Sequence, residues 1–215
     1  MSDYASIERQ LSDALRLERR PVAVTFRESP PAGVAKFSGT EPSGCSFWRL
    51  AAEGRAFYTV AADHFNCPIG SYTHNLPLPP ERATELEQTL ALMAGIGYID
   101  MAEVPGDPDL VLLAGRPGRV MLFHEAARRA GVAAPASLLG RPTCMALPAA
   151  LATGVVTSTG CIGNRVYTDL GEDELYVVVP GKDLARIVEQ AQTIAAANTT
   201  LFEYHRGRRH TLASE

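Results

Sequence analysis

An internal repeat that contains all four cysteines constrains this chain more than any other feature of its sequence. Phe65–Thr73 reads Phe-Asn-Cys-Pro-Ile-Gly-Ser-Tyr-Thr, and Thr157–Thr168 reads Thr-Ser-Thr-Gly-Cys-Ile-Gly-Asn-Arg-Val-Tyr-Thr. Each stretch has a cysteine, a glycine within three residues of it and a Tyr-Thr pair further along. The same elements in the same order indicate an internal duplication.

The similarity extends upstream of both stretches. Cys45 precedes Gly54 by nine residues, and Cys144 precedes Gly154 by ten. We interpret each copy as a cysteine, a short helix, a glycine, a short strand and a second cysteine beside a glycine-containing turn. The repeat therefore predicts that 45–73 and 144–168 adopt the same fold.

The length of the chain fits one domain made of two related halves. With 215 residues it is long for one simple domain and short for two large ones. We expect a single domain over 1–215, with repeat units at about 21–75 and 110–180. A composition of 46% hydrophobic and 20% charged residues is typical of a globular protein with a buried core.

Hydrophobic periodicity predicts an α/β fold. Apolar runs rich in β-branched residues predict buried strands at 21–26, 110–115 and 174–180. Helical spacing predicts helices over 3–17, 81–94, 117–130 and 183–197, and a helix that starts near Cys45. A strand followed by a helix is typical of α/β proteins. The predicted architecture is a mixed sheet with packed helices, built from two halves related by a pseudo-twofold axis.

Charge and hydropathy exclude two classes of partner. A formal net charge of -4 gives no basic face for nucleic acid, and Arg206–His210 is interpreted as a solvated tail. No apolar run approaches the roughly eighteen residues of a membrane span, and the polar start carries no secretory signal. We therefore expect a cytoplasmic protein whose cysteines are thiols or metal ligands instead of disulfides.

The four cysteines are the candidate metal ligands. Cys45 and Cys144 are expected near helix N-termini, where partial positive charge favours the thiolate that binds metal. Cys67 and Cys161 lie beside glycine turns, which direct backbone N–H groups at anions. If the halves pack about a pseudo-twofold axis, the four thiolates can meet and bind zinc or an iron–sulfur cluster.

Other roles for these residues stay open. No Cys-x-x-Cys motif is present, so reactive thiols in a small-molecule pocket and plain buried thiols are alternatives. His64, Cys67 and His74 also form a compact group that could bind a metal without the second half, or supply a base beside a thiol.

Five further residues of the two copies are predicted to bind a ligand. Asn164 and Arg165 follow Cys161 directly, and Arg165 suits either an anionic substrate or a surface salt bridge. Gly70 lies in the first turn, and Tyr72 and Tyr167 occupy matching places where they can pack between the halves.

We expect a metal- or iron–sulfur-binding protein that acts in redox or Lewis-acid chemistry on a small molecule. The alternative is a non-enzymatic small-molecule-binding or sensor protein with structural or reactive thiols. Whether the chain forms a homo-oligomer stays open at this point.

The sequence also resembles a known family. Cys161–Thr168, then Asp-Glu-Leu-Tyr-Val-Val-Val-Pro and Asp-Leu-Ala-Arg-Ile-Val, resemble the C-terminal signature of the ArCR family, a prokaryotic domain of unknown function. Arg20-Pro-Val-Ala-Val, Cys45 with Ala51 and Gly54, and Asn66-Cys67-Pro68 also match, so the resemblance covers about 17–190. It implies little about activity. Ser-Tyr-Thr-His-Asn after Cys67 departs from the alanine-rich continuation of the family and makes His74 specific to this branch.

Overall fold

The computed structural model describes residues 3–64, 95–100, 107–132, 134, 138–140 and 146–212. The helices in these ranges are α1 (Tyr4–Leu15), α2 (Gly44–Ala52), α4 (Pro117–Arg129), α5 (Leu147–Thr153), α6 (Ile162–Thr168) and α7 (Gly181–Leu212), with a 3-10 turn η1 at Ala61–His64. The strands are β1 (Val22–Thr25), β2 (Phe57–Val60), β3 (Gly95–Asp100), β4 (Leu110–Gly115), β5 (Leu138–Leu139), β6 (Val156–Ser158) and β7 (Leu175–Pro180).

The sheet has the symmetry that the repeat predicts. Its strand order is β2-β3-β1-β4-β7-β6-β5. The two halves meet where β1 pairs antiparallel with β4, with Ala23 opposite Val111. Outward from that seam, β3 and then β2 follow β1, and β7 and then β6 follow β4, always antiparallel. The strands are therefore related by a pseudo-twofold axis at the β1–β4 seam, and β5, which pairs parallel with β6, makes the sheet mixed.

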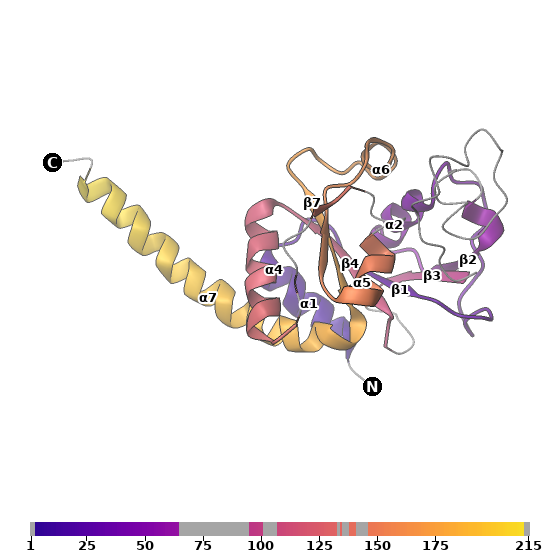
Figure 1. Ribbon diagram of the computed structural model, residues 1–215, viewed down its shortest axis with the longest axis horizontal. Coiled ribbons are helices and arrows are strands. Elements are labelled where there is room, and N and C mark those ends of the chain that lie inside the picture. Colours follow the sequence, from indigo (N-terminus) through magenta and orange to yellow (C-terminus); the bar gives the residue numbers. More distant parts are fainter. Residues whose placement is uncertain are drawn as a thin grey trace.

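Helices cover both faces of the sheet (Figure 1). On one face α1, α4 and the first half of α7 pack on inward side chains such as Ala23, Val111 and Val177. On the other face α2 and α5 pack on the alternate positions, including Leu112 and Val178. Because both faces are covered, β4 is buried along its whole length, as its continuous apolar run predicts.

Local chemistry explains several element ends. Asp3 caps α1, since its side chain accepts a hydrogen bond from the Ser6 N–H at 3.1 Å. Pro117 opens α4 at a position where a missing N–H costs nothing. Gly54 and Gly154 follow α2 and α5 with φ of 93° and 104°, a conformation that disfavours any side chain.

The matching units share an order of elements. In the first half α2 leads to Gly54 and β2; in the second α5 leads to Gly154 and β6. The predicted fold class, a mixed α/β sheet built from two related halves, is therefore confirmed.

The structure adds one strand that was not predicted and extends one predicted helix. A third prediction cannot be compared with it. A strand at 95–100 was not predicted, because its two glycines read as the end of a helix. The last helix was expected to end at 197 but continues to Leu212. The helix expected over 81–94 lies outside the described residues.

Candidate functional site

The N-terminus of α2 holds Cys45 in a buried position, directly after a glycine that lies against His64. Ser43 caps the helix and accepts a hydrogen bond from the Cys45 N–H at 3.0 Å. Cys45 is 8% exposed. A Cβ atom at Gly44 would lie 2.7 Å from His64 Nδ1, so only glycine allows the helix to start this close to the imidazole. His64 Nε2 also lies 2.8 Å from the Thr59 hydroxyl.

The N-terminus of α6 holds Cys161 at the surface. Cys161 is the N-cap residue, and its Sγ accepts a hydrogen bond from the Asn164 N–H at 3.4 Å. Gly160 precedes it with φ of 73°, and a Cβ atom there would lie 2.8 Å from Asn164 Oδ1. The backbone before α6 therefore approaches the buried Asn164 amide as closely as glycine permits.

Helix α2 of the first half packs against α6 of the second, over β7. The Tyr176 hydroxyl of β7 donates a hydrogen bond to Thr168 Oγ1 at 2.9 Å, and its ring meets that of Trp48 edge-on, with centroids 5.4 Å apart. Burial raises the pKa of Tyr176 to about 12, and the nearby Cys45 adds a smaller increase. Cys45 and Tyr176 are thus near enough to interact, and the phenol is neutral at physiological pH.

Buried polar atoms without a hydrogen-bond partner gather on these two helices. They are Ser46 Oγ, Trp48 Nε1 and Arg49 Nε on α2, and both amide atoms of Asn164 on α6. The Asn164 side chain lies near enough to the Tyr176 hydroxyl to lower the pKa of the phenol by hydrogen bonding, although the contact does not reach normal hydrogen-bond geometry. Buried polar groups normally have a hydrogen-bond partner. The donors and acceptors between α2 and α6 can therefore bond to a water molecule or a polar ligand.

A small cavity lies against this cluster. A space of about 20 Å³ is lined by Trp48, Arg49, Thr168 and Tyr176, with Arg19 at its edge. A volume of about 10–15 Å³ is enough for one water molecule. The cavity thus fits a water molecule and not a substrate, and the described part of the site is a packed polar cluster.

The remaining predicted site residues are distributed as follows. Cys67, Gly70, Tyr72, His74 and Cys144 lie outside the described residues. Within the described ranges no group of three or more His, Cys, Asp or Glu residues is arranged to hold a metal. The convergence of all four cysteines therefore stays a prediction.

The predicted ligand residues on α6 face in different directions. Asn164 is buried and Tyr167 is 37% exposed. Arg165 donates hydrogen bonds to the backbone carbonyls of Gly171, Thr159 and Glu174. Its guanidinium thus joins α6 to the turn before β7, which leaves less of it available for a substrate.

Residues on β7, α2 and α6 complete a cluster that sequence reasoning missed. Tyr176, Trp48 and Thr168 were assigned to ordinary packing or not singled out. Tyr176 alternates with Val177 and Val179, which face the opposite helix layer, so strand alternation could have placed it on the α2 side.

A second polar pair lies on the other face of the sheet. His124 Nε2 on α4 lies 2.5 Å from Thr157 Oγ1 on β6, at one wall of an open cavity of about 630 Å³. Desolvation lowers the pKa of His124 below its usual value. The neutral imidazole is held by the threonine, in agreement with a histidine at the boundary of the core.

The fold and the cysteine-bearing helices define a duplicated α/β protein with thiols on one face of its sheet. The chain belongs to the uncharacterised ArCR family, domain of unknown function 169, whose model matches residues 10–99 and again 91–190. No curated protein and no solved structure matches the chain. None of the described helices has the length and apolar character needed to cross a membrane.

Proposed function

We propose that this protein binds a metal ion or an iron–sulfur cluster through cysteine thiolates where its two halves meet. The bound group would act in redox or Lewis-acid chemistry on a small molecule, in the reducing environment of the cytoplasm. One observation carries the proposal: α2, which begins with Gly44 and Cys45, packs against α6, which is capped by Cys161. The two helices belong to different halves, and each has its cysteine at the N-terminal end.

The repeat extends this argument to the other two cysteines. The sequence pattern matches Cys144 with Cys45 and Cys67 with Cys161. A pseudo-twofold axis repeats every contact between the halves. The packing of α2, which carries Cys45, on α6, which carries Cys161, therefore implies a matching approach of the segments that carry Cys144 and Cys67. Cysteine thiolates are the ligands that zinc and iron–sulfur clusters prefer.

The polar surroundings of the thiols support the same proposal. The amide of Asn164, the hydroxyl of Ser46 and the indole N–H of Trp48 are buried, and none makes a hydrogen bond of normal geometry within the described part of the chain. Donors of this kind can bond to sulfur ligands, and such contacts tune the potential of a cluster or orient its ligands.

The test is metal analysis of protein purified without air. We expect either stoichiometric zinc in a colourless sample or a broad visible absorption band that bleaches on oxidation. The Cys45→Ser, Cys67→Ser, Cys144→Ser and Cys161→Ser variants should each lose the metal, because a closed site needs every ligand. Ala52→Ser, at the opposite end of α2 from Cys45, is the control and should keep the metal.

The variants also separate a joint site from a site in one half. Loss of metal only from Cys67→Ser, His64→Ala and His74→Ala would place the ligands in the first half. Metal content equal to that of the wild type in all four cysteine variants would end the proposal.

A second function is favoured by the unequal exposure of the two described cysteines. Cys161 is exposed at the surface, whereas Cys45 is buried. An accessible thiol beside a polar cluster suits a binding or sensor protein that reacts reversibly with a small molecule. A metal-free protein in which iodoacetamide labels Cys161 much faster than Cys45 would favour this function over the first.

A further inference from the structure

Helix α7 is much longer than the face of the sheet that it covers. Its 32 residues span about 48 Å. The side chains that pack on the core lie in its first half and recur at helical spacing, ending with Ala191 and Ile194. Beyond Ile194 the helix leaves the body as an arm (Figure 1). The first half of α7 thus belongs to the core, and the second half projects from it.

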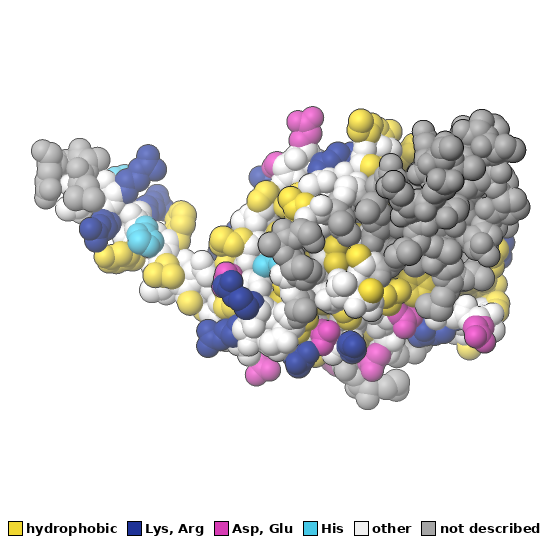
Figure 2. Space-filling model, in the orientation of Figure 1, with side chains coloured by type: hydrophobic (Ala, Val, Ile, Leu, Met, Phe, Trp, Pro, Cys, Tyr) yellow, Lys and Arg dark blue, Asp and Glu magenta, His cyan; other side chains and the backbone are white. Residues whose placement is uncertain are grey.

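The apolar stripe of α7 continues along the projecting half, where its side chains are exposed. Leu201 and Phe202 follow Ile194 at the same spacing, and they are 52% and 63% exposed. Figure 2 shows hydrophobic side chains along the arm, followed by basic ones toward its end. A single helix in water gains little stability on its own, so a stripe of this kind normally packs on a partner.

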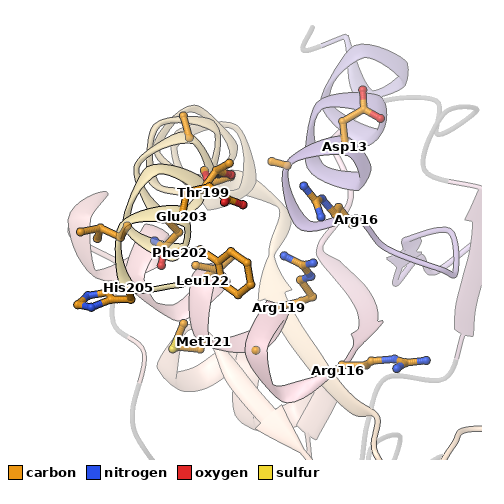
Figure 3. A pocket seen from close by; sticks show the side chains of 16 residues that line it. Asp13, Arg16, Arg116, Arg119, Met121, Leu122, Thr199, Phe202, Glu203 and His205 are labelled. Carbon is orange, nitrogen blue, oxygen red and sulfur yellow. Dashed lines mark hydrogen bonds between the residues drawn. The ribbon is translucent and has the colours of Figure 1, made fainter. Parts of the chain in front are cut away.

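A cavity opens at the base of the arm, between α1, α4 and α7. It has a volume of about 820 Å³, and its walls include the buried Leu122 and the exposed Met121 of α4. Arg16 from the end of α1 and Arg119 from α4 extend into it, facing Phe202 (Figure 3). Within the described part of the chain neither arginine forms an ion pair. The lining also includes Asp13 and the chain's own Glu203, so charges of both signs border the cavity, and a partner that brings an apolar side chain and a carboxylate can pair with the two arginines.

The arm itself carries that combination. Glu203 follows Phe202 directly and is the only acidic residue of α7 beyond Ile194, whereas Arg206, Arg208 and Arg209 follow further along. Among the described contacts Glu203 forms no ion pair with Arg16 or Arg119 of its own chain. A second copy whose α7 runs antiparallel can place its Phe202 on the apolar wall and its Glu203 at these arginines.

We propose that the projecting half of α7 is the dimer interface of this protein. Two copies pack their arms antiparallel about a twofold axis, and each arm fills the cavity at the base of the other. An isologous contact of this kind uses every interaction twice and closes on itself. The overall charge of -4, with the basic cluster on the arm, leaves the body acidic and disfavours a contact between two bodies.

The first test is the mass in solution, by size exclusion with light scattering and by sedimentation. We expect a dimer at micromolar concentration for the wild type and a folded monomer for the Leu201→Glu/Phe202→Glu double variant. Tyr204→Ser is the matched control, since Tyr204 is equally exposed on α7 but does not line the cavity. Far-UV circular dichroism checks that each variant keeps its helices.

Charge reversal tests the orientation of the two arms. Arg119→Glu and Glu203→Arg should each weaken dimerisation roughly tenfold or more, and the double variant should recover most of the loss, because the ion pair is restored in the opposite sense. A monomeric wild type, or a dimer unaffected by Leu201→Glu/Phe202→Glu, overturns the proposal. A monomer that inorganic phosphate stabilises, except when Arg16 and Arg119 are both alanine, would assign the cavity to a small anion.

Discussion

Two constraints favour glycine at position 160, in the turn before α6. Its φ of 73° disfavours any residue with a Cβ atom, and that atom would lie 2.8 Å from Asn164 Oδ1. Gly33 has a similar φ of 78° but faces open space. Alanine variants of Gly160 and Gly33 therefore separate the free-energy cost of backbone strain from that of the close contact.

We expect Gly160→Ala to lower the free energy of unfolding by about 2–4 kcal/mol and Gly33→Ala by about 1 kcal/mol. Urea denaturation of both variants measures the difference. Equal losses would mean that the Asn164 amide moves aside without cost, and that the polar cluster between α2 and α6 is not tightly packed.

Tyr176 gives the protein a pH dependence in the alkaline range. Its pKa is about 12 in the folded protein against an ordinary value of 10.0, chiefly because the ring is buried. The unfolded chain therefore releases this proton first as pH rises. The contribution of the neutral phenol to stability is complete below pH 10 and is lost as pH rises toward 12.

We expect Tyr176→Phe to be less stable than the wild type by about 1 kcal/mol at pH 8, because Thr168 Oγ1 loses a donor. By pH 11 the wild type should lose about 1.4 kcal/mol relative to the variant. Urea denaturation at the two pH values measures this change. A difference that stays constant with pH would contradict the raised pKa, whatever its size at pH 8.

At the scale of elements, Gly54 and Gly154 test the duplication. Each follows the short helix of its half with a positive φ, in the places where the repeat in the sequence aligns them. Alanine at either position should lower the free energy of unfolding by a similar amount, about 1–2 kcal/mol, since both glycines have a positive φ. Gly118→Ala, in the first turn of α4 with open space around it, should cost nothing or stabilise slightly.

Thermal unfolding of the three variants measures these effects. If Gly54→Ala were strongly destabilising and Gly154→Ala neutral, the two turns would not be equivalent. The outcome for Gly118→Ala shows whether alanine is tolerated at a glycine with no need for a positive φ.

The strongly periodic elements could be predicted from the sequence, and the others could not. The runs that become β4 and β7 are apolar throughout, and α4 and the start of α7 have clear helical spacing, so their positions were predicted within a few residues. Strand β3 contains Gly95 and Gly97, which reduce strand propensity, and its pairing with both β1 and β2 overrides that tendency. Helix α7 continues past 197 through a stretch where no proline or capping glycine ends it.

The site was predictable only at the level of its cysteines. The sequence predicted Cys45 near a helix N-terminus and Cys161 beside a glycine turn, and the structure adds that Cys161 caps α6, which packs against α2. The contacts of Tyr176 and Trp48 could not be predicted, because they depend on how α2 crosses the sheet between the halves. Arg165 was expected at a ligand, yet it donates hydrogen bonds to the carbonyl of Thr159 before α6 and to those of Gly171 and Glu174 before β7, a role that spacing does not show.

At the scale of the whole molecule, the pairing of β1 with β4 makes one continuous sheet out of two homologous halves. Each half completes the core of the other, since Trp48 of α2 lies against Tyr176 of β7. In the part of the chain that the structure describes, each of the two core clusters combines side chains from both halves. We therefore expect the halves to unfold together as a single cooperative unit.

Trp48, the one tryptophan of the chain, allows this expectation to be measured. Its fluorescence reports on the contact between the halves, whereas far-UV circular dichroism is dominated by the longer helices α4 and α7 of the second half. The two signals should change at the same urea concentration with the same slope, and Val111→Ala at the seam should lower both midpoints together by an equivalent of about 1–3 kcal/mol. Two separate transitions would mean that each half is a folding unit by itself, and the pseudo-twofold seam would then be an interface between two domains instead of the centre of one.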